Sequence, residues 1–76
     1  MTINQAFKIA SKNIGGEMES SALVRLHLAS DCIDRGLYNY AWENILKSLF
    51  YSVGAFHKDY IFVKESYDLE MQAMEI

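Results

Sequence analysis

Residues Arg35 to Tyr60, RGLYNYAWENILKSLFYSVGAFHKDY, decide how this chain of 76 residues folds. Apolar residues between Tyr38 and Phe56 recur every three or four positions, which is the spacing of one face of an α-helix. Gly36 precedes them, and glycine readily adopts the left-handed backbone conformation that ends a helix. The stretch therefore predicts a tight turn followed by a helix over residues 38–56, as the second arm of a helical hairpin.

The same spacing continues on both sides of this stretch and predicts three further helices, over residues 3–14, 20–35 and 59–74. The chain contains no proline, which suits uninterrupted helices. Sustained two-residue alternation, the mark of a half-buried strand, is absent. We predict one all-α domain spanning residues 1–76, a compact array of four short helices around the hairpin of the second and third.

Several residues have the chemistry expected at helix ends. Thr2 and Gln5 have the spacing of a capping box, and Gly15-Gly16 is expected to end the first helix. The segment Glu17–Ser21 offers serines as caps and acids for the positive end of the second helix. Asp59 is expected to cap the fourth helix.

The apolar residues of the second and third helices predict the core. In the third helix, one continuous face is expected to be buried; it consists of Tyr38, Ala41, Trp42, Ile45, Leu49, Val53 and Phe56. The second helix has an unusually wide apolar arc, and such a helix is expected to be mostly enclosed. That arc consists of Ala22, Leu26, Ala29 and Ile33, widened by Leu23, Leu28 and Cys32.

Composition limits the possible functions. Seven basic and ten acidic residues give a net charge of −3, which disfavours nucleic acid as a partner because phosphate contacts need a basic face. Cys32 is the single cysteine, so no internal disulfide can form, and no Cys/His set has zinc-site spacing. The chain shows no signal-peptide or membrane-span pattern, and we expect a cytoplasmic protein without a cofactor.

The hairpin resembles a single tetratricopeptide unit. The pattern of such a unit has a small residue in the first helix, Gly-x-Tyr at the turn and packing positions at helical spacing in the second helix. The matching residues here are Leu28, Ala29, Gly36, Tyr38, Ala41, Ile45 and Ser48. Arg25 stands where the pattern has a tryptophan-like residue, Val53 stands at the terminal proline, and no second repeat is present. The resemblance implies an antiparallel helical hairpin.

The third helix has aromatic residues on two sides. At about 100° per residue, Tyr40 and Tyr51 fall nearly opposite Trp42, with Lys47 and Gly54 between them. Phe50 lies close to this group. Aromatic rings are enriched at protein interfaces, and glycine lets a neighbouring backbone approach closely. Tyr40, Lys47, Phe50, Tyr51 and Gly54 are therefore the candidate interface, unless the first or last helix covers them.

Two alternatives rest on other residues. The second and third helices have the order of a DNA-binding helix-turn-helix, although Lys47 is the only cation on the would-be recognition helix. His27 and Asp31 lie one helical turn apart and could bind a metal ion for catalysis, although the pattern is generic and more often marks a solvated strip. Cys32 is expected to be a small buried residue rather than a nucleophile.

Opposite charges at the two ends of the chain suggest that the first and last helices lie side by side. Lys8 and Lys12 occur in residues 1–16, which contain no acid, whereas residues 59–76 contain five acids and one lysine. We expect a non-enzymatic interaction protein, a homodimer that binds and modulates another protein. Small acidic helical chains of this kind are typical of bacterial or phage accessory and inhibitor proteins, by analogy alone.

Overall fold

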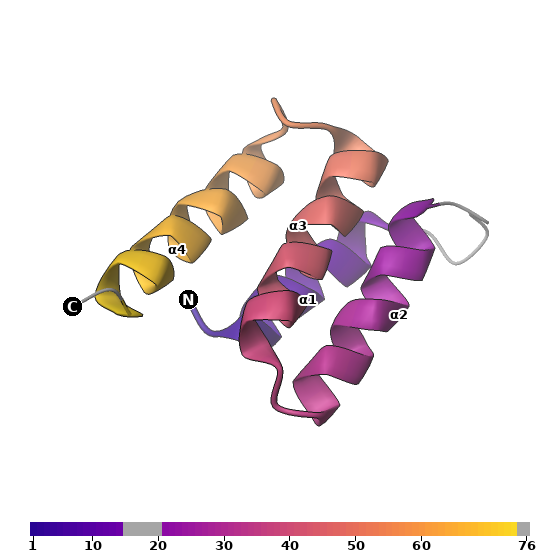
Figure 1. Ribbon diagram of the computed structural model, residues 1–76. Helices are drawn as coiled ribbons and strands as arrows, with labels where there is room; N and C mark the ends of the chain where they lie inside the picture. The colour runs from indigo at the N-terminus through magenta and orange to yellow at the C-terminus, as the bar shows by residue number, and fades with distance from the viewer. Residues whose placement is uncertain (15–20, 75–76) are drawn as a thin grey trace.

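The computed structural model describes residues 1–14 and 21–74, which form four α-helices and no strand (Figure 1). Their bounds are Ile3–Asn13 for α1, Ser21–Asp34 for α2, Tyr38–Val53 for α3 and Lys58–Met74 for α4. The predicted all-α array of four helices is confirmed. Gly15-Gly16 and the acids and caps predicted at residues 17–20 lie outside the described residues.

Helices α2 and α3 form an antiparallel hairpin and make the most extensive contact in the fold. Helix α1 crosses behind this hairpin, and α4 lies along the side of α3 that faces away from α2 (Figure 1). Because α3 contacts all three of the other helices, it is the centre of the fold.

The turn between α2 and α3 has the geometry that the glycine predicts. Gly36 has a φ of +75°, and its N–H donates to the carbonyl of Ile33 at 3.1 Å. The N–H of Leu37 donates to the carbonyl of Cys32 at 2.8 Å. These two bonds make a Schellman motif, which satisfies carbonyls at the end of α2 and turns the chain sharply back into α3.

The capping box at the start of α1 is present. The Thr2 hydroxyl oxygen accepts from the Gln5 N–H at 3.2 Å, and the Gln5 side-chain oxygen accepts from the Thr2 N–H at 2.8 Å. Two backbone donors that lack intrahelical partners are thereby satisfied.

Helix α3 is shorter than the sequence predicts. It ends at Val53 because Gly54 adopts a φ of +88°. The Gly54 N–H closes the helix by donating to the carbonyl of Phe50 at 3.0 Å. Phe56, predicted to be the last residue of the helix, is 98% exposed and lies beyond it. The prediction was wrong because the apolar spacing continues past a residue whose backbone leaves the helix.

Helix α4 begins one residue earlier than predicted, and a different residue caps it. The His57 Nδ1 atom accepts from the Asp59 N–H at 3.1 Å, so the imidazole takes the capping role predicted for Asp59. The Asp59 carboxylate instead accepts from the Asn13 side-chain amide at 2.9 Å. This bond joins the end of α1 to the start of α4.

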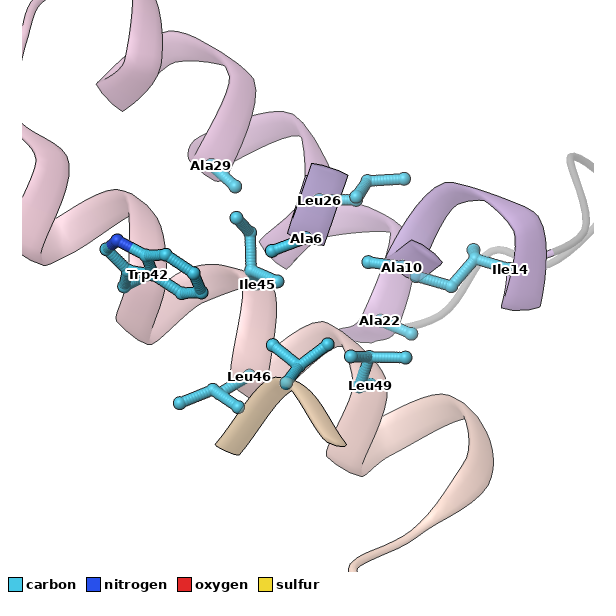
Figure 2. Close-up of a cluster of buried hydrophobic side chains, with 11 residues drawn as sticks. Ala6, Ala10, Ile14, Ala22, Leu26, Ala29, Trp42, Ile45, Leu46 and Leu49 are labelled. Carbon is cyan, nitrogen blue, oxygen red and sulfur yellow. The ribbon is translucent and has the colours of Figure 1, made fainter. Parts of the chain in front are cut away.

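The core lies where α1, α2 and α3 meet, and side chains from the three helices point toward one another there (Figure 2). Ile45 and Leu49 are fully buried, and Trp42 is 6% exposed. The predicted core face of the third helix is therefore confirmed at Trp42, Ile45 and Leu49, but Tyr38 at its start is 56% exposed and does not belong to the core. Helix α4 adds Val63 to this cluster.

Small residues line the contact between α2 and α3. Ala22 and Ala29 of α2 and Ala41 and Ser48 of α3 are all fully buried, and the members of each pair are seven residues apart. Residues at that spacing lie two helical turns apart on one face. The Ser48 hydroxyl donates to the carbonyl of Ile45 at 2.6 Å, so this polar group is satisfied inside the helix.

Helix α2 is not mostly enclosed, contrary to the prediction from its wide apolar arc. Ala22, Leu26 and Ala29 are buried as expected, but Leu28 is 42% exposed and Val24 is 59% exposed. Helices α1 and α3 cover only one side of α2, so an apolar residue on the opposite side remains in contact with water.

Candidate interaction surface

Helix α3 has one side that none of the other three described helices covers. Tyr40, Asn44, Lys47 and Tyr51 follow one another at steps of four, three and four residues, so they form one stripe along the helix. Tyr40 is 61% exposed and Tyr51 is 50% exposed. Lys47 is exposed and Asn44 is half-buried. We call these four residues the α3 stripe.

Helix α2 extends this surface. Val24 and Leu28 lie one helical turn apart on the exposed side of α2. Tyr51 lines a shallow hollow together with both of these residues and with Arg25, so its ring reaches toward α2. The α3 stripe, Val24 and Leu28 together form a continuous exposed surface, which we call the outer face.

Hydrogen bonds hold the middle of the outer face in place. The Asn44 side-chain amide donates to the carbonyl of Tyr40 at 2.9 Å. The Arg25 guanidinium donates to the Asn44 side-chain oxygen at 3.4 Å. These bonds link α2 to α3 and fix the orientation of Asn44, so the outer face is supported by two packed helices rather than by a loop.

Phe50 lies at the edge of this region, on the side of α3 that faces α4. Its ring packs edge-on against Tyr51 at 5.8 Å between centroids and against Tyr60 of α4 at 6.2 Å. Phe50 is nevertheless 51% exposed. It supports Tyr51 from the side and forms the border between the outer face and α4.

Gly54 has a different place from the one predicted for it. The prediction put it inside the third helix, beside the rings, where it would admit a neighbouring backbone. It is instead the residue at which α3 ends, and its positive φ explains why glycine occurs there. A Cβ atom built at Gly54 would meet nothing within 4 Å, so no residue in the described ranges packs closely against it.

The sequence prediction of the surface omitted Val24 and Leu28. The signal that could have identified them is the width of the apolar arc of α2, which is larger than two neighbouring helices can cover. A wide arc is also what an enclosed helix shows, so the width alone does not distinguish an enclosed helix from one with exposed apolar residues. Because few helices in an array of four can pack against α2, the apolar residues of α2 that they do not cover lie on the outside.

The residues of the metal hypothesis do not form a binding site in the described part of the chain. His27 and Asp31 are both exposed, as is Asp34 one helical turn further along α2. No group of three or more His, Cys, Asp or Glu side chains among the described residues is arranged to hold a metal ion. Cys32 is half-buried, which is less buried than predicted.

The charges of α1 and α4 do not pair as the sequence suggested. Lys8 and Lys12 are exposed, and the ion pair that the described residues form lies within α4, between Lys64 and Asp68 at 2.6 Å. The hydrogen bond from Asp68 raises the pKa of the Lys64 ammonium above its ordinary value. Both groups are largely in solvent, so this pair contributes little to stability.

No protein-family model matches this chain, and neither the curated proteins nor the solved structures include a match. Within the described residues, no helix is both long enough and apolar enough to cross a membrane. Inferences about function therefore rest on the geometry of the outer face.

Proposed function

We propose that this chain is a non-enzymatic protein-protein interaction module that contacts its partners through the outer face. The observation that carries the proposal is the exposure of Tyr40 and Tyr51, at 61% and 50%, on the central helix of the fold. Tyrosine is enriched at the energetic centre of protein interfaces because its ring offers apolar area and its hydroxyl offers a hydrogen bond.

The composition of the outer face supports this proposal. Two rings and two aliphatic side chains surround a polar centre of Asn44 and Lys47. An apolar surface with a few fixed polar groups is typical of a specific contact. Because two packed helices carry these side chains, no loop would have to become ordered on binding, which lowers the entropic cost of association.

The proposed partners are a second copy of the chain and another protein that it modulates. A chain of 76 residues buries only about 60% of the surface that its unfolded form exposes, so self-association is a common source of additional stability at this size. Twofold dimers are the commonest oligomers. The cytoplasm remains our proposed compartment, because the chain has a single cysteine and no disulfide.

A nucleic-acid regulator built on α2 and α3 receives less support. The outer face carries Lys47 as its one cation, and Arg25 beside it is engaged with Asn44. Binding to phosphates needs several cations together. An enzymatic role for His27 and Asp31 receives less support as well, because no group of three or more His, Cys, Asp or Glu side chains among the described residues could hold a metal ion.

Site-specific photocrosslinking in the expressing cell tests the proposal. A photoreactive phenylalanine analogue replaces Tyr51 in one variant and Glu65, an exposed residue of α4, in the control. We expect adducts from position 51 and few or none from position 65. An adduct with twice the 8.7 kDa mass of the chain indicates self-association. An adduct with a different mass indicates that the partner is another protein. Position 51 giving no more adduct than position 65 would reject the outer face as a contact surface.

A further inference from the structure

The α3 stripe has a spacing that is the same in both directions along the helix. Its members are separated by four, three and four residues, with a tyrosine at each end and a polar residue at each inner position. The midpoint lies between Ile45 and Leu46. A contact between two copies of one surface about a twofold axis needs such self-complementarity, since each residue meets its counterpart in reverse order.

We propose that the partner seated on the outer face is a second copy of this chain, with α3 packed antiparallel to α3 about a twofold axis through the midpoint of the stripe. This inference rests on the proposed function. In this arrangement Tyr40 lies opposite Tyr51 of the second copy, and Asn44 lies opposite its Lys47. Both tyrosine pairs flank the polar centre.

Charge complementarity is the observation that favours this occupant. Glu43 and Lys47 are both exposed and lie one helical turn apart on the same side of the α3 stripe. Within the described chain neither forms an ion pair, although Lys64 and Asp68 at the same spacing do. The side chains of Glu43 and Lys47 are thus available to charges on another molecule.

The antiparallel twofold brings these charges together across the contact. The twofold axis keeps Glu43 of one copy and Lys47 of the other on the same side of the interface. Along the helix axis these two residues are offset by about one residue, or roughly 1.5 Å. The symmetry repeats the contact, so the dimer contains two Glu43–Lys47 ion pairs between copies. In a parallel arrangement, with the twofold axis along the helices, Glu43 and Lys47 of the second copy would lie on opposite sides of the interface, so these ion pairs would not form.

Helix α2 fits the same symmetry. The Arg25–Asn44 hydrogen bond places α2 beside the α3 stripe. Because the antiparallel twofold keeps each side of the interface on the same side, α2 of the second copy lies on this side too, and Val24 and Leu28 of the two copies face one another there. Exposed apolar area on α2 is covered by the same apolar area of the second copy, and the two hairpins form a four-helix interface.

Charge-swapped variants test the arrangement by sedimentation velocity over a range of concentrations. We expect wild-type chain to form dimers and the Tyr40→Ser/Tyr51→Ser variant to be monomeric. Lys47→Glu alone gathers four acids at the contact, and Glu43→Lys alone gathers four cations. Each should raise the dimer dissociation constant by about tenfold or more, because like charges at an interface are repulsive.

An equimolar mixture of Lys47→Glu and Glu43→Lys chains gives the decisive result. The heterodimer regains both ion pairs, so the mixture should dimerise nearly as well as the wild type, and so should the double variant Glu43→Lys/Lys47→Glu. A matched control pairs Lys8→Glu with Glu65→Lys, two exposed sites off the outer face; neither these chains nor their mixture should change the dissociation constant. Circular dichroism checks that each variant remains helical.

The possible failures are distinguishable. A wild-type chain that remains monomeric at every concentration overturns the second copy as occupant, whereas adducts to another protein from position 51 would still support the outer face as a contact surface. A wild-type dimer that the tyrosine variant disrupts, but that the charge mixture does not restore, overturns the antiparallel arrangement and leaves the proposed function intact. Absence of both adducts and dimer rejects both.

Discussion

Helix α3 buries six of its 16 residues, whereas α4, with 17 residues, buries only Val63 among its described side chains. Both helices have apolar residues at helical spacing, so their sequences do not predict this difference. It arises because α3 has a neighbour on three sides and α4 rests mainly against α3. Apolar residues at helical spacing give a helix a face that can be buried. The number of neighbouring helices then decides how much of that face is buried.

Helix α4 is held mostly by its first turns and by two aromatic contacts, Tyr60 with Phe50 and Tyr67 with Trp42. Asp59 is bonded to Asn13 of α1, and Tyr67 packs against Trp42 at 6.2 Å between ring centroids. In contrast, Phe62 and Leu69 are 54% and 67% exposed. Few buried apolar contacts imply a low free energy of local opening. We therefore expect α4 to detach more readily than the α2–α3 hairpin unfolds.

Removing the Trp42 ring should have the largest effect, because Trp42 belongs to the core of the hairpin and also contacts α4. We expect Trp42→Ala to lower the free energy of unfolding by about 3–5 kcal/mol, which is much of the stability of a domain this small. Urea unfolding at a protein concentration below the dimer dissociation constant measures this free energy. Phe56→Ala is the control, since its 98% exposed ring should cost under about 0.5 kcal/mol. A loss under about 1 kcal/mol at Trp42 would contradict the packing described.

Truncating Val63 should weaken α4 specifically. We expect Val63→Ala to lower the free energy of α4 opening by about 2 kcal/mol, from the lost methyl groups and the cavity that they leave. Native-state hydrogen exchange of α4 amides measures this opening. Ile45→Ala is the matched control, because Ile45 is fully buried within the hairpin core and should lower global stability without changing α4 opening. Equal exchange free energies in α3 and α4 of the wild type would show that the two helices open together.

Replacing the capping histidine should have the smallest effect. His57→Ala removes the acceptor of the Asp59 N–H, and we expect a loss of about 1 kcal/mol, as for other N-cap truncations. His57→Asn retains a side-chain acceptor and should keep most of that stability. Urea unfolding of the three chains provides the comparison. Equal losses for both substitutions would mean that the imidazole does not act as a cap.

Much of the fold could be predicted from local sequence. The capping box of Thr2 and Gln5 and the turn at Gly36 depend on interactions within a few residues, so the sequence near them is sufficient. The same approach failed at Gly54 and Phe56, because apolar spacing continued where the backbone left the helix. It also missed the His57 cap, since histidine is not among the usual capping residues.

Less of the candidate surface could be predicted. Tyr40, Lys47 and Tyr51 were identified because they lie opposite Trp42 on one helix, and helical geometry alone fixes that relation. Val24 and Leu28 were missed because their exposure depends on where α1 and α3 cross α2. The link from Arg25 to Asn44 spans 19 residues of sequence, and no local pattern indicates it.

The sequence by itself determined that this chain forms helices, roughly where they begin and end, and which side of α3 is buried, because backbone hydrogen bonding and the helical repeat act over a few residues. Only the tertiary structure decided that α2 leaves Val24 and Leu28 uncovered, that α4 is shallowly packed and that α2 completes the outer face. Exposure depends on which helices come together, and those contacts join residues far apart in the chain.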